Sequence, residues 1–95
     1  MAETEFLVVF AYDVQRDANR RRIAAQLEDQ ATRVQYSVFE GRQTIAKAQR
    51  LLKRLDRERM DGDSIRMYVL TEQARERSQA LGGPPIAERS EVWLL

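Results

Sequence analysis

A one-layer β-sheet covered by two helices is the fold class that the sequence predicts. Residues 6–12 form an unbroken apolar and aromatic run, which is typical of a strand buried on both faces. Apolar residues recur at helical spacing in two later stretches, 18–30 and 44–59. The chain has 95 residues, so one domain with a thin core is expected, and dimerisation is a natural way to bury more apolar surface.

The first predicted strand ends at a carboxylate, Asp13. Ligands and catalytic groups gather at strand ends, and burying an unpaired charge costs several kcal/mol, on the order of ~3 or more. Asp is also common in turns and helix caps. On this strand alone, the ordinary role in a turn or cap is the preferred interpretation.

Each predicted helix has one apolar face. The first helix spans 18–30, with Asp17 as an N-cap that also suits the helix dipole. Its expected buried residues are Ile23, Ala24, Leu27 and Ala31. The second helix spans 44–59, and its expected buried residues are Ile45, Ala48, Leu52 and Leu55. The opposite, basic face would track a DNA backbone, so that binding would weaken steeply with salt. That face carries Lys47, Arg50, Lys53, Arg54 and Arg57.

The rest of the chain alternates extended and irregular segments. Residues 33–40 are predicted as one extended segment that ends at Gly41, and 64–70 as a strand after an Asp61-Gly62 turn. Residues 71–75 fit a turn or one helical turn, and 76–81 fit a helix or an edge strand. Residues 82–85 are irregular because they combine two Gly with two Pro. A final strand at 91–95 could complete the sheet of a partner chain.

The composition limits the chemistry. There is no Cys and no His, which excludes disulfides, thiolate nucleophiles, structural zinc and imidazole catalysis. Carboxylate oxygens suit a hard cation such as magnesium or manganese. The formal net charge is +1, and of 16 basic residues only Lys47 and Lys53 are lysines. This arginine bias suits nucleic acid, and equally a GC-rich genome or a hot habitat.

Targeting signals are not evident. No apolar run is long enough to cross a membrane, and the first residues lack the layout of a signal peptide. The expected location is therefore the cytoplasm, without membrane association.

Three consecutive arginines lie near the start of the first helix: Arg20, Arg21 and Arg22. The helix dipole disfavours cations there, so another partner is needed. A phosphate, Asp13 or Asp17 would serve. For Arg21 a solvated helix face is an acceptable explanation.

These residues together resemble a known family, the CRISPR-associated adaptation endonucleases, which are the small partners of the CRISPR integrase. The resemblance covers nearly the whole chain. It rests on Tyr12-Asp13, the arginine-rich helix start, RVQYSVFEG at 33–41, DSIRMY at 63–68, and LGGPP at 81–85. The extended motif at 33–41 is the most specific of these.

The resemblance implies a ferredoxin-like α+β fold, with an antiparallel sheet and two helices on one face. The chain would be one domain, 1–95, with a core at 1–81 and a C-terminal spacer and strand at 82–95. Two copies would pair sheet to sheet as a homodimer with the terminal strand exchanged. The family fold also splits or bends the segment 33–40, and we adopt that expectation over a single strand.

The resemblance further implies a metal-dependent endonuclease acting on single-stranded RNA or double-stranded DNA, and a dimer that bridges integrase dimers on DNA. Asp13 from each of two chains would share one Mg²⁺, with Mn²⁺ as the alternative. Two carboxylates so close repel each other unless a cation lies between them, which predicts a pH-sensitive site.

Other site residues follow from the same resemblance. Tyr12 would orient substrate or, as we prefer, end the core strand. Arg20, Arg22 and Arg33 would contact phosphate. Phe39 would stack on a base or, as we prefer, occupy a core or dimer-contact position.

Two other functions compete with the nuclease. One is a scaffold that bridges DNA in the integration complex without cleaving it. The other is a toxin-like RNA nuclease of the same fold. A plain ferredoxin-like RNA-binding domain is disfavoured, because no paired exposed aromatic residues are expected on a central strand.

Overall fold

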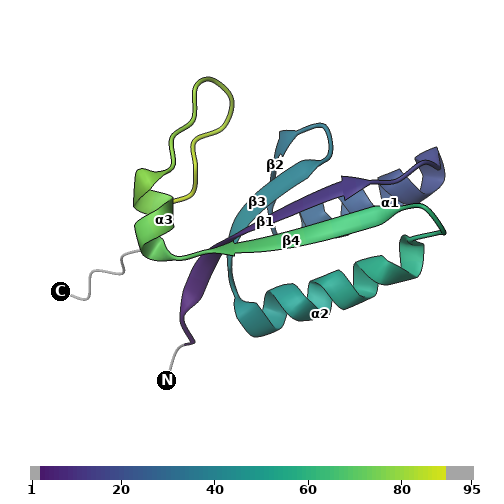
Figure 1. The fold of residues 1–95 in the computed structure, drawn as a ribbon, viewed down its shortest axis with the longest axis horizontal. Coiled ribbons are helices and arrows are strands. Elements are labelled where there is room, and N and C mark those ends of the chain that lie inside the picture. The colour runs from purple at the N-terminus through teal and green to yellow at the C-terminus, as the bar shows by residue number, and fades with distance from the viewer. Residues whose placement is uncertain (1–2, 90–95) are drawn as a thin grey trace.

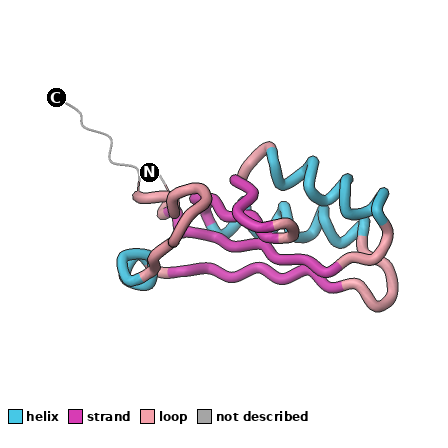
Figure 2. Tube along the Cα trace, turned by 90° about the horizontal axis from the view of Figure 1, so that it is seen from above, coloured by secondary structure: helices cyan, strands magenta, loops and turns pink. Residues whose placement is uncertain are grey.

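The computed structural model describes residues 3–89 (Figure 1). Its elements are β1 (Glu5–Asp13), α1 (Asp17–Glu28), β2 (Thr32–Gln35), β3 (Val38–Thr44), α2 (Ile45–Leu55), the 3₁₀ helix η1 (Asp56–Glu58), β4 (Ser64–Leu70) and α3 (Glu72–Arg77). The four strands form one sheet in the order β2-β3-β1-β4, and each neighbouring pair is antiparallel. Figure 2 shows α1 and α2 on the same side of this sheet. The ferredoxin-like α+β fold is thus confirmed.

The core lies between the sheet and the two long helices. From β1, Val8, Phe10 and Tyr12 face the helices, where they meet residues such as Ile23 of α1 and Leu51 of α2. Val9 and Ala11 alternate with them and are only partly buried. The expectation of a strand buried on both faces therefore holds only at Leu7, which is 2% exposed, because α1 and α2 leave the other face of the antiparallel sheet partly open.

The first helix begins one residue earlier than expected. Arg16, in an extended conformation, is the N-cap, and Asp17 is the first helical residue, with no side-chain capping bond. Asp17 instead pairs with Arg20, one turn along the helix. The helix ends at Glu28, so Ala31 lies beyond it but still packs against the core.

The second helix begins at Ile45, with Thr44 as a true N-cap whose hydroxyl accepts a hydrogen bond from the Lys47 amide. It ends at Leu55 and continues as η1 rather than reaching residue 59. Its buried residues are Ala48, Leu51 and Leu55. Ile45 is 40% exposed and Leu52 only partly buried, so the buried stripe includes Leu51, which the expected pattern omitted. The basic face of α2 is exposed as expected.

The segment 33–40 folds as a hairpin, as the resemblance implied. A turn at Tyr36 and Ser37 separates β2 from β3, and the register shifts between Arg33 and Gln35. Gly41 lies inside β3 instead of ending it. A Cβ at position 41 would lie 2.8 Å from the Gln30 carbonyl oxygen, so the chain connecting α1 to β2 can pass this close only over glycine.

The C-terminal part of the described chain is held by one arginine. Thr71 caps α3 through a hydrogen bond from the Ala74 amide. After α3 the chain is irregular, with Gly82 and Gly83 at positive φ, and neither a helix nor an edge strand spans 76–81. Arg75 donates to the carbonyls of Ile86 and Ala87 at 2.9 and 2.7 Å. The strand predicted at 91–95 lies outside the described residues. Within 3–89, no helix has the length and apolar character needed to cross a membrane.

Candidate nucleic-acid interface

Asp13 is the last residue of β1 and lies opposite Ser64, the first residue of β4. It is exposed, whereas Tyr12 before it is 6% exposed and packs in the core. Because side chains alternate along a strand, Asp13 projects to the side of the sheet away from the helices. A rigid strand thus presents one carboxylate to solvent.

The connection after Asp13 is held by a buried carboxylate, Asp63. Its Oδ1 accepts a hydrogen bond from the Gln15 amide at 3.1 Å, and its Oδ2 accepts one from the Met60 amide at 3.0 Å. Asp63 is 8% exposed, so these two bonds replace the water that it loses on folding. Sequence reasoning gave Asp63 no such role. Its place between an Asp-Gly turn and a strand was the available signal.

Arg20 holds the same connection from the helix side. One terminal nitrogen donates to the carbonyls of Val14 and Gln15, each at 2.8 Å, and the guanidinium also pairs with Asp17. Most of its donors are therefore engaged within the chain. The structure places Arg20 behind the strand end that carries Asp13, where it fixes this loop.

Arg22 points to a different part of the molecule. It donates to Glu58 Oε2 at 2.5 Å and to Asn19 Oδ1 at 3.0 Å. Asn19, which is buried, in turn donates to the Glu58 carbonyl at 2.6 Å. This network ties α1 to η1, and the structure does not bring Arg22 together with Arg20 and Arg33.

A cavity of about 410 Å³ lies between α1 and the β2–β3 hairpin. It is lined by Tyr12, Arg20, Arg21, Ala24, Ala25, Glu28, Arg33 and Tyr36. Arg21, set aside in the sequence as a solvated residue, is thus the arginine that joins Arg20 and Arg33. The spacing of 21, 24, 25 and 28 on one helical face was the signal that could have found it.

Arg33 lies between aromatic rings at the edge of this cavity. Its guanidinium carbon is 5.1 Å from the ring centre of Phe39 and 6.0 Å from that of Tyr36. One of its nitrogens is 3.5 Å from the Tyr12 hydroxyl. Phe39 is fully buried and stacks on Tyr12, which favours the core position over base stacking. Tyr36, by contrast, is 72% exposed.

The side chains near Asp13 offer few ligands for a metal ion. Carboxylate oxygen suits Mg²⁺, and exposed Asp13 is of the right kind. Within residues 3–89, however, no group of three or more Asp and Glu side chains is arranged to hold a metal ion. Within the described residues, Asp13 is therefore not part of a ready-made cluster of carboxylate ligands.

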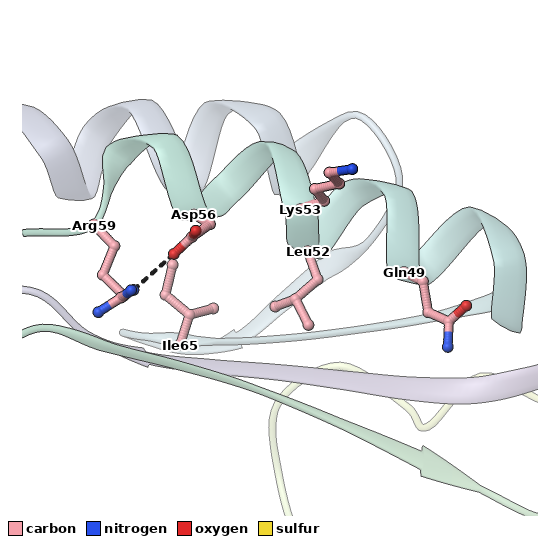
Figure 3. A pocket seen from close by; sticks show the side chains of 6 residues that line it. All are labelled: Gln49, Leu52, Lys53, Asp56, Arg59 and Ile65. Atoms are coloured by element: carbon pink, nitrogen blue, oxygen red, sulfur yellow. Dashed lines mark hydrogen bonds and ion pairs between the residues drawn. The ribbon is translucent and has the colours of Figure 1, made fainter.

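A second cavity, of about 340 Å³, lies between α2 and β4 (Figure 3). Its lining residues are Gln49, Leu52, Lys53, Asp56, Arg59 and Ile65. Asp56 accepts a hydrogen bond from Arg59 at 2.8 Å, and this bond, together with the Asp56 charge, raises the pKa of Arg59 above its ordinary value. Asp13 does not line this cavity, so we treat the cavity as separate from the strand end that carries Asp13.

The four-stranded antiparallel sheet with α1 and α2 on one face defines a small ferredoxin-like α+β domain. This domain carries an exposed carboxylate at a strand end and an arginine-lined cavity. Residues 6–78 match the family model described as CRISPR associated protein Cas2. The chain therefore belongs to the Cas2 family.

Three relatives show the extent of the similarity. The "CRISPR-associated endoribonuclease Cas2 3" of Synechocystis sp. is 38% identical, over 87% of this chain and 91% of the relative. The crystal structure of Streptococcus pyogenes Cas2 is 33% identical, with a TM-score of 0.67, and the match covers 80% of this chain and 99% of that chain. A chain of a partial Cas6-RT-Cas1–Cas2 complex is 27% identical, with a TM-score of 0.73, and the match covers 95% and 99%.

Proposed function

We propose that this protein acts in CRISPR adaptation as a magnesium-dependent endonuclease that cleaves phosphodiester bonds in single-stranded RNA, double-stranded DNA or both. The observation that carries this proposal is the exposed carboxylate of Asp13 at the end of a strand, followed by a loop that Arg20 holds in place. The relative from Synechocystis is named as an endoribonuclease, which supports cleavage of RNA. The arginine-lined cavity supports binding of a polyanion.

The proposed metal site needs two chains. Asp13 supplies one hard oxygen donor, and the same residue of a second copy would supply another. A bound Mg²⁺ would neutralise phosphate charge and make water a better nucleophile. Within the chain, Arg20 and Asp63 hold the loop behind Asp13, so the carboxylate keeps its position while the substrate binds.

Removing the Asp13 charge tests this proposal. In Asp13→Asn we expect Mg²⁺-dependent cleavage of labelled RNA and duplex DNA to fall by about 100-fold or more, because a metal ligand is lost. Asp29→Asn is the matched control, since Asp29 is also an exposed carboxylate, and it should cleave like the wild type. Equal cleavage by Asp13→Asn and the wild type would contradict the proposal.

A scaffold without catalysis is the second candidate function. The exposed basic face of α2 supports binding to a DNA backbone without cleavage, and the similar chain in a Cas1–Cas2 complex supports an integrase partner for this chain. Asp13→Ala separates the two candidates in a cell with its integrase. Loss of spacer acquisition would support catalysis, and full acquisition would leave the scaffold role alone.

A further inference from the structure

Tyr36 is an exposed aromatic side chain that lies beside an arginine packed against the core. It occupies the turn between β2 and β3 and is 72% exposed. The Arg33 guanidinium lies 6.0 Å from its ring centre, and Arg33 is itself held against buried Phe39 at 5.1 Å. The hairpin therefore presents a largely uncovered aromatic ring, with a cation close to it, at the rim of the cavity.

The arginines of this cavity differ in how many of their N–H donors are already bonded. Arg20 donates to two backbone carbonyls and pairs with Asp17. Arg21 makes no hydrogen bond or ion pair with any residue in the described range 3–89, and Arg33 makes only the 3.5 Å contact with the Tyr12 hydroxyl. Arg21 and Arg33 thus keep guanidinium donors for an anion. The forked N–H groups of a guanidinium match the oxygens of a phosphate.

Glu28 is the only carboxylate that lines the cavity in the described structure. It lies seven residues after Arg21, about two helical turns or ~10 Å along α1. A phosphate is repelled from that end and attracted to the Arg21 end. A carboxylate can instead accept a hydrogen bond from the amino group of a base. The cavity therefore has one end for an anion and one end for a hydrogen-bond donor.

We propose that this cavity holds one unpaired nucleotide of a nucleic-acid strand, with its base stacked on Tyr36 and its phosphate at Arg21 and Arg33. This inference rests on the proposed nucleic-acid function and assigns the site a substrate class. A volume of about 410 Å³ is in the range of small-molecule sites, roughly 300–1,000 Å³, and suits one nucleotide. A base can stack on a side chain only when its face is free, which excludes a base inside a duplex.

The binding test compares Tyr36→Ala with Tyr36→Phe, in the presence of a chelator so that no strand is cleaved. The probe is a fluorescent ten-nucleotide RNA without self-complementarity, and anisotropy gives its Kd. Tyr36→Ala should weaken binding by about fivefold to 100-fold, because stacking on the ring is lost. Tyr36→Phe keeps the ring and should bind within twofold of the wild type. A duplex DNA of similar length should bind all three proteins alike.

Two further variants serve as a matched pair. Arg21→Gln should weaken RNA binding and flatten its dependence on salt, because one phosphate contact is lost. Arg22→Gln removes the same charge from a position that does not line the cavity, where Arg22 pairs with Glu58, and should bind the RNA more tightly than Arg21→Gln does. Circular dichroism of every variant confirms folding.

Several results would overturn the inference. One is failure of the wild type to bind the RNA. Another is equal RNA affinity of Tyr36→Ala and the wild type. A third is an equal loss of affinity for the RNA and for the duplex DNA in Tyr36→Ala. If the wild type never cleaves but the Tyr36 dependence holds, the nuclease proposal fails and this inference stands. If cleavage depends on Asp13 but Tyr36→Ala binds normally, this inference fails alone.

Discussion

At the scale of single residues, Asp63 determines how firmly the proposed site is built. It is a buried carboxylate whose two oxygens accept amide hydrogen bonds from separate loops. One of these loops follows Asp13 directly, and the other precedes β4. Losing either bond would leave a buried donor without a partner, which costs more than the bond contributes when it is made.

We therefore predict that Asp63→Asn destabilises the protein by about 1–3 kcal/mol, because an amide can accept only one of the two bonds. Urea denaturation measures the change. Asp61→Asn is the matched control, since Asp61 lies exposed in the same turn, and its effect should stay within about 0.5 kcal/mol. Equal stability of the two variants would show that Asp63 does not hold these loops together.

Sequence alone predicted the strand-end position of Asp13 and the core role of Tyr12, because the apolar run 6–12 ends at Tyr12 and a carboxylate follows it. It could not predict which of the three consecutive arginines lines the cavity and which pairs within the chain. Neighbouring residues on a helix point about 100° apart, and the side that faces nucleic acid depends on partners distant in sequence. Arg22 pairs with Glu58, 36 residues later in the chain, and does not line the cavity. The β2–β3 hairpin places Arg33 and Tyr36 in the same cavity as Arg21.

At the scale of elements, the β2–β3 hairpin determines the shape of the cavity. Its two strands looked like one in the sequence because the turn at Tyr36 and Ser37 contains neither Gly nor Pro, the usual signals. The glycine nearby, Gly41, serves packing instead of turning, since the Gln30 carbonyl would lie 2.8 Å from any Cβ there. The boundaries of β4 could be predicted from the sequence, because an Asp-Gly turn precedes that strand.

For Gly41→Ala we predict a loss of about 1–3 kcal/mol in the free energy of unfolding, because the contact forces backbone to move. At Gly62 a Cβ would have no atom within 4 Å, and φ is +88°. Asn tolerates that left-handed conformation, so Gly62→Asn should cost less than the single methyl group at position 41. Thermal unfolding of both variants decides, and the reverse order would contradict the packing argument.

At the scale of the whole molecule, the sheet is covered unequally. Both long helices lie on one face (Figure 2), and the other face carries Asp13 and the half-exposed Tyr68 of β4. A pair of chains brought together through this face could contribute both Asp13 carboxylates to one ion, which is the arrangement that our proposed mechanism needs.

This arrangement predicts one bound Mg²⁺ for every two chains. Isothermal titration calorimetry gives the ratio, and sedimentation in the same buffer gives the mass of the protein. Asp13→Asn should remove the binding, because both ligands of the shared site are lost together. A ratio of one ion per chain on a monomer would contradict the shared site.

In the connection between β1 and α1, three backbone groups of Val14 and Gln15 are bonded to side chains from other parts of the chain. Arg20 donates hydrogen bonds to the carbonyls of Val14 and Gln15, and Asp63 accepts one from the amide of Gln15. An inserted residue would pull at least one of these partners out of reach. The length of this connection is therefore fixed by the fold, and an engineered tag or a permuted terminus belongs instead in the exposed loop around Leu81.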